Sequence, residues 1–114
     1  MNILALIAAI IMVESGGNTY AVGDNGRAFG SMQIHQCVID DVNRVYNTHY
    51  VHEDAFNEHK ARDMFIKYIH MYATHRRLGR EPTMEDMARI WNGGPNGYRK
   101  ESTIKYWEKV KERL

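Results

Sequence analysis

The sequence predicts a mainly α-helical protein with about five helices and a short loop or β-hairpin region near residues 18–29. Apolar residues recur at intervals of three and four along most of the chain, and glycine-rich stretches separate these segments. The length of 114 residues suits one domain, because two separate cores would each be small. We therefore expect a single domain over residues 1–114.

The first helix is expected to follow Asn2, a favourable N-cap residue, and to end near Ser15, because Gly16 and Gly17 stop the pattern. Its apolar run Ile3–Val13 is too short to span a bilayer and lacks the basic leader and cleavage site of a signal peptide. We interpret this run as a core helix, so we expect neither an export signal of the chain's own nor membrane insertion.

The rest of the chain predicts a hairpin and four more helices. Asn25-Gly26 is the favoured pair for a two-residue hairpin turn. The helices are expected over Ser31 to about Tyr46, His59 to Arg77, Thr83 to Trp91, and Glu101 to Arg113. The helix after Thr83 has the clearest start, because Asp86 stands three residues later, as in a capping box.

Composition excludes several classes of function. The chain has 15 basic and 14 acidic residues, so no strong field favours nucleic acid. Cys37 is the single cysteine, and His35, two positions away, would point elsewhere on a helix, which argues against a cysteine enzyme. His49, His52 and Glu53 lack the His-Glu-x-x-His pattern of a zinc site, so we expect no metal and no cofactor.

Glu14 is the first candidate for chemistry. It directly follows the apolar run Ile3–Val13, so its carboxyl is expected at the end of a buried helix. Burial disfavours the charged form and raises the pKa of a carboxyl, which suits a general acid at neutral pH. A glutamate near a helix end is also a common structural feature.

Short segments in the same order resemble a known family. The segment Val13–Asn18 looks like the catalytic-glutamate motif of lytic transglycosylases and goose-type lysozymes, and Gly30–Ile34 resembles their Gly-x-Met-Gln-Ile/Leu segment. Ala88–Gly94 is similar to their Ala-x-x-Tyr-Asn-x-Gly segment, and Tyr106 with Val110 matches their closing Tyr-x-x-x-Val. The resemblance covers most of the chain. It implies a lysozyme-like fold and cleavage of the β-1,4 bond between N-acetylmuramic acid and N-acetylglucosamine in peptidoglycan.

The resemblance also implies roles for single residues. Glu14 would protonate the glycosidic oxygen, and the hydroxyl of Tyr106 would orient its carboxyl, unless Tyr106 is a core residue. The substrate-binding positions would be Ser15, Gly30, Met32, Gln33, Trp91 and Asn92. Ser15 would hold the carboxyl or bond to local backbone, and Gly30 would let the backbone approach the sugar.

Within this set, Met32 and Gln33 would line the cleft, and Asn92 would bond to the acetamido group. Trp91 stands where the family usually has tyrosine, so a hydroxyl is replaced by a larger stacking face.

Asp24 leaves the reaction type open. It matches an aspartate that helps to position water in goose-type lysozymes, but His35 stands where these enzymes carry a second aspartate, and Asp-Asn-Gly is also ordinary turn chemistry. We favour a lytic transglycosylase that forms 1,6-anhydro ends. The alternatives are a lysozyme in which Asp24 positions water, and a non-catalytic peptidoglycan-binding module.

The expected partner is therefore the glycan strand of peptidoglycan, bound by a monomer. The place of action is the cell wall, reached from the periplasm or the exterior. Delivery by phage lysis, by a virion or by a secretion apparatus would all fit.

Overall fold

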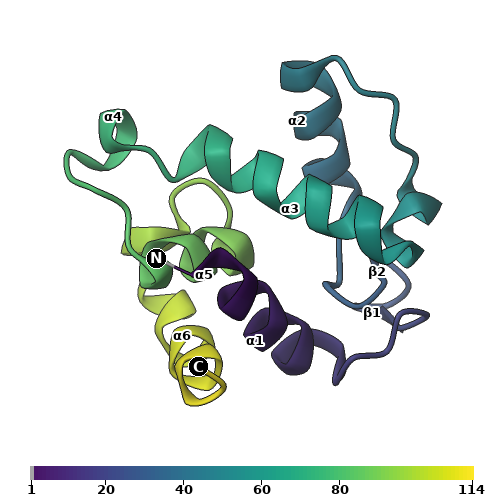
Figure 1. The fold of residues 1–114 in the computed structure, drawn as a ribbon, viewed down its shortest axis with the longest axis horizontal. Helices are drawn as coiled ribbons and strands as arrows, with labels where there is room; N and C mark the ends of the chain where they lie inside the picture. Colours follow the sequence, from purple (N-terminus) through teal and green to yellow (C-terminus); the bar gives the residue numbers. More distant parts are fainter. Residues whose placement is uncertain (1) are drawn as a thin grey trace. The chain divides into compact units, whose positions relative to one another are not determined.

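A computed structural model describes residues 2–114, which divide into two compact units. One unit comprises residues 11–68, and the other comprises Ile69–Leu114 together with the start of the chain up to Ile10. The described residues form six α-helices and one antiparallel pair of short strands (Figure 1), so the predicted mainly α fold is confirmed. The prediction of one domain stays a prediction.

Helix α1 (Ile3–Ser15) begins as predicted, because the backbone N–H of Ala5 donates to the side-chain oxygen of Asn2 at 3.1 Å. It ends at Ser15, because the next residue, Gly16, has a φ of +65° and donates its N–H to the carbonyl of Met12 at 3.1 Å. Its buried side chains are Leu6, Ile7, Ala9, Ile10 and Ile11. Among residues 2–114, neither α1 nor a later helix has the length and apolar character needed to cross a membrane.

The hairpin is present, but its turn is longer than predicted. Strand β1 (Val22–Gly23) pairs with β2 (Ala28–Phe29), with Val22 opposite Phe29. Four residues join the strands, because Asp24 and Asn25 both adopt left-handed conformations, with φ of 49° and 56°, before Gly26. The prediction of a two-residue Asn-Gly turn is therefore wrong.

The second helix starts later than predicted. Helix α2 covers Gln36–Tyr46, whereas the sequence predicted a start at Ser31. The preceding residues are not helical, because Gln33 has a φ of +52° and Ile34 pairs with Phe29 through two backbone hydrogen bonds of 2.8 and 3.0 Å. This antiparallel bridge turns the segment back onto the hairpin and leaves it as a loop.

The predicted third helix is two helices, α3 (Glu58–Tyr72) and α4 (His75–Leu78). The helical conformation is interrupted at Thr74, whose backbone is extended. The hydroxyl of Thr74 accepts a hydrogen bond from the N–H of Arg77 at 3.2 Å. A threonine that caps a new helix competes with continuation of the old one. A 3₁₀ helix, η1 (His52–Phe56), precedes α3 and was not predicted.

In the last third of the chain, helix α5 (Met84–Gly93) starts at its predicted capping signal. The predicted capping box is confirmed by hydrogen bonds in both directions between Thr83 and Asp86. Burial by itself raises the pKa of Asp86, but hydrogen bonds from Arg80 and Thr83 outweigh this effect and hold the pKa below its ordinary value. The last helix, predicted over Glu101 to Arg113, starts later, as α6 (Ile104–Glu112), because the 3₁₀ helix η3 (Glu101–Thr103) precedes it; a further 3₁₀ helix, η2 (Gly97–Arg99), lies before η3.

Candidate functional site

Glu14 lies in the last turn of α1, where its side chain is partly exposed. The next residue, Ser15, joins this helix end to a later loop, because its hydroxyl lies 2.8 Å from the carbonyl oxygen of Ser31. The same hydroxyl lies 3.2 Å from the carbonyl of Ile11 and accepts a hydrogen bond from the N–H of Gly17. These three contacts are all with backbone atoms, and a role of Ser15 in holding the Glu14 carboxyl stays a prediction.

That loop, residues 30–33, packs against η1 through Gly30. Gly30 has a φ of +82°, and a Cβ atom placed on it would lie only 2.0 Å from the carbonyl oxygen of Ala55. Its N–H donates to the carbonyl of Ala21 at 2.8 Å. The contact with Ala55 explains why a glycine stands here. The predicted approach of Gly30 to a sugar stays a prediction.

Met32 and Gln33 also support the loop. The amide nitrogen of Gln33 donates to the carbonyl of Gly30 at 3.0 Å and to that of Ala21 at 3.3 Å, so both of its N–H groups have partners within the protein. Met32 is fully buried. The hydrogen bond from Gln33 to Ala21 joins the loop to the residue that directly precedes β1. A role of the two side chains in lining a cleft stays a prediction.

The structure brings Asp24 and His35 together, which the sequence did not reveal. Nε2 of His35 lies 2.7 Å from Oδ2 of Asp24, and a guanidinium nitrogen of Arg27 lies 3.8 Å from the other carboxylate oxygen. The hydrogen bond with His35, followed by the charge of Arg27, lowers the pKa of Asp24. Asp24 is therefore held as an anion within an exposed ion-pair cluster.

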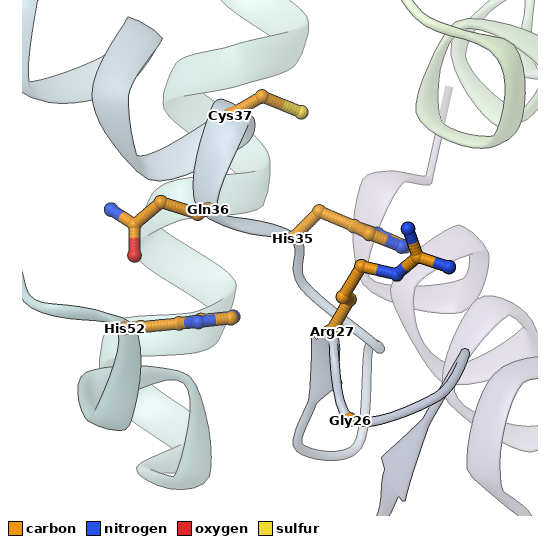
Figure 2. A pocket seen from close by; sticks show the side chains of 6 residues that line it. All are labelled: Gly26, Arg27, His35, Gln36, Cys37 and His52. Atoms are coloured by element: carbon orange, nitrogen blue, oxygen red, sulfur yellow. The ribbon is translucent and has the colours of Figure 1, made fainter.

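A pocket of about 350 Å³ opens beside this cluster (Figure 2). Its lining residues are Gly26, Arg27, His35, Gln36, Cys37 and His52. His52 is held firmly, because its ring stacks on Phe29 with a centroid separation of 3.7 Å and its Nε2 lies 2.8 Å from the carbonyl oxygen of Ile34. Phe29 also stacks on Phe56. Sequence reasoning considered His52 only as a metal ligand and missed this pocket. Among residues 2–114, no group of His, Cys, Asp and Glu side chains is arranged to hold a metal ion.

The other predicted site residues lie in the second unit. Asn92 is exposed in the last turn of α5, and Trp91 beside it is only 8% exposed, so most of its ring is buried. Tyr106 is partly exposed on α6, which packs against α5. The predicted residues thus form two groups, with Glu14 among those in the unit of residues 11–68.

Two kinds of comparison, with protein families and with solved structures, find similar proteins. The family model described as the transglycosylase SLT domain matches residues 2–113. A chain in the crystal structure of Aeromonas hydrophila PliI in complex with Meretrix lusoria lysozyme is similar in structure, with a TM-score of 0.80 and 26% sequence identity. That match covers 95% of this chain and 87% of the other. No protein with a curated function matches the sequence.

Proposed function

The chain belongs to the transglycosylase SLT family and has the predicted lysozyme-like fold, and from this premise we propose that it is a lytic transglycosylase of peptidoglycan. The observation that carries the proposal is the family match over residues 2–113. The placement of Glu14 supports it, because Ser15 ties the end of α1 to the loop of residues 30–33. The experiment that tests it is digestion of purified cell walls followed by mass spectrometry of the released muropeptides.

In the proposed reaction, Glu14 donates its proton to the oxygen that links N-acetylmuramic acid to N-acetylglucosamine, and the bond from this oxygen to the muramic C1 breaks. The C6 hydroxyl of the same muramic acid then attacks C1 and returns its proton to Glu14. The product is a 1,6-anhydro end, so no water is consumed. In this proposal, Tyr106 orients the Glu14 carboxyl, and Asn92 bonds to the acetamido group.

The contacts of Asp24 favour this reaction over hydrolysis. Asp24 would have to hold a water in the lysozyme alternative, but its carboxylate is already engaged by the hydrogen bond with His35 and by the nearby charge of Arg27, which also lower its pKa. Oδ2 of Asp24 is already bonded to Nε2 of His35, at a distance of 2.7 Å. The alternative is hydrolysis, with Asp24 positioning water, and the next experiment distinguishes it from the proposed reaction.

Replacement of Asp24 by asparagine is expected to leave the cleavage rate and the anhydro products nearly unchanged, because a transglycosylase does not need a second carboxylate. The measurement is the product spectrum, in which anhydro and reducing ends differ by the mass of one water. Asp41→Asn removes another aspartate that is paired with an arginine, and serves as the control. A large loss of rate in Asp24→Asn alone, together with reducing-end products, would establish the lysozyme alternative.

Replacement of Tyr106 by phenylalanine removes one hydroxyl and is expected to reduce the cleavage rate more than the stability. The loss of one hydrogen bond costs about 0.5–1.5 kcal/mol of unfolding free energy, whereas a misdirected proton donor slows every turnover. Thermal melting and initial rates are measured on the same preparation, with Tyr98→Phe as the control in the same unit. If the rate holds while the melting temperature falls, Tyr106 is a core residue and has no part in the reaction.

We further propose that the enzyme acts as a monomer and as one catalytic domain, on the cell wall, from the periplasm or the exterior. A non-catalytic binding module is the remaining alternative, and it would bind cell walls without reducing the turbidity of their suspension.

A further inference from the structure

The last turn of α5 carries Asn92 and leads directly into two glycines, Gly93 and Gly94. Glycine restricts the backbone little, so the local sequence does not fix the direction in which the chain leaves the helix. The last carbonyl groups of a helix also have no partner within it. The position of Asn92, which is exposed on this turn, is therefore set in part by contacts from outside the helix.

Lys100 makes the contact nearest to Asn92. Its Nζ donates to the carbonyl oxygen of Gly93, the next residue along the chain, at 2.7 Å. A cation is favourable at this position, because the carbonyl end of a helix carries partial negative charge. Lys100 is itself fixed, since a guanidinium nitrogen of Arg89 donates to its backbone carbonyl at 2.8 Å. The contact therefore holds the end of α5 from the segment that leads into α6.

Arg77, on α4, holds the residues that follow. One of its terminal nitrogens donates to the carbonyl oxygens of Tyr72, at 2.7 Å, and of Pro95, at 2.9 Å. The other donates to the side-chain oxygen of Asn96 at 3.1 Å. Because Tyr72 is the last residue of α3, this one guanidinium joins the end of α3 to the segment after α5. Arginine suits the task, because its planar group carries several N–H donors in fixed directions.

We propose that Lys100 and Arg77 are positioning residues, which hold the end of α5 so that the amide of Asn92 meets the acetamido group of a bound sugar. The inference rests on the proposed function, in which Asn92 binds this group. Neither basic residue touches the sugar in this proposal, so both act through Asn92. Their effect on sugar binding must therefore disappear when the amide of Asn92 is removed.

The test is a binding titration with tri-N-acetylglucosamine, a soluble sugar that carries acetamido groups, followed by the backbone amide signals of Gly93 and Gly94 in ¹⁵N-labelled protein. Lys100→Met removes the ammonium group and is expected to weaken binding about twofold to tenfold, the value of one hydrogen bond. Lys100→Arg keeps a donor and should restore most of the affinity. Lys109→Met, at an exposed position of α6 in the same unit, is the matched control and should bind like the wild type.

Arg77→Gln is expected to weaken binding over the same range, about twofold to tenfold. Its matched control is Arg76→Gln, which makes the same change at the exposed neighbouring position of α4. In a protein that already carries Asn92→Ala, neither Lys100→Met nor Arg77→Gln should weaken binding further, because the bond that they position is gone.

Thermal melting of each variant separates positioning from a purely structural role, which would lower the melting temperature and leave the affinity unchanged. That result overturns the proposal. So does an equal loss of affinity with and without Asn92→Ala, because the basic residues would then act by another route. A wild-type protein whose Gly93 and Gly94 signals do not respond to the sugar would also overturn it.

The titration does not depend on cleavage, so it separates this inference from the proposed function. If cell walls are cleaved to anhydro ends and the variants bind the sugar like the wild type, only the positioning roles are wrong. If the variants weaken binding as expected and cell walls are not cleaved, only the proposed reaction is wrong.

Discussion

Replacement of Glu14 by glutamine is expected to reduce cleavage of cell walls by about 100-fold or more while the protein stays folded. Glutamine has nearly the same shape, but its amide cannot donate a proton to the glycosidic oxygen. Because Glu14 is partly exposed at the end of α1 and glutamine has nearly the same volume, the substitution should change stability little. The measurement is the initial rate of turbidity loss, with circular dichroism to confirm the helix content.

Glu53→Gln is the matched control, because it makes the same chemical change at an exposed position of η1 in the same unit. It should retain the wild-type rate. A Glu14→Gln protein that clears cell walls as fast as the wild type would remove Glu14 from the mechanism.

Replacement of Gly30 by alanine is expected to lower the free energy of unfolding by about 2–4 kcal/mol. Two costs add here: the residue has a φ of +82°, and its new Cβ would lie 2.0 Å from the carbonyl oxygen of Ala55. This oxygen belongs to backbone, so η1 must move away from the loop. We expect activity to fall as well, because Ser15 ties the end of α1 to the adjacent residue Ser31.

Gly26→Ala separates the two costs. Gly26 has a φ of +86°, nearly that of Gly30, but a Cβ placed on it would meet no atom within 4 Å. It should therefore show only the conformational cost, about 1–2 kcal/mol. Chemical denaturation of both variants gives the free energy of unfolding. Equal losses of this free energy at the two positions would show that the contact with Ala55 adds no cost.

Local signals in the sequence predicted the helix boundaries that depend on neighbouring residues alone. Asn2 and Thr83 start α1 and α5 as expected, because an N-cap acts within its own first turn. The start of α2 was missed because it depends on the pairing of Ile34 with Phe29. The apolar spacing of Ile34 and Val38 fits a helix, and only this pairing, together with the left-handed Gln33, excludes it.

In the candidate site too, the sequence predicts what depends on neighbouring residues and misses what depends on distant contacts. Glu14 could be found from its position after an apolar run and from the resemblance of the residues around it. The partnership of Asp24 with His35 could not, because it depends on the four-residue turn that brings the hairpin back toward the start of α2. The position of His52 depends in turn on its stacking with Phe29, a contact between residues far apart in the sequence.

The stacking of Phe29 on His52 and on Phe56 also bears on the order in which the chain can fold during synthesis. The hairpin and its bridge to Ile34 involve near neighbours and can form as soon as these residues leave the ribosome. The residues that pack against the hairpin are synthesised later, because Ala55, His52 and Phe56 all lie in η1. We therefore expect a nascent chain that stops before residue 52 to lack the segment that packs on the hairpin, and the loop of residues 30–33 to gain its contact with Ala55 only after η1 has been made.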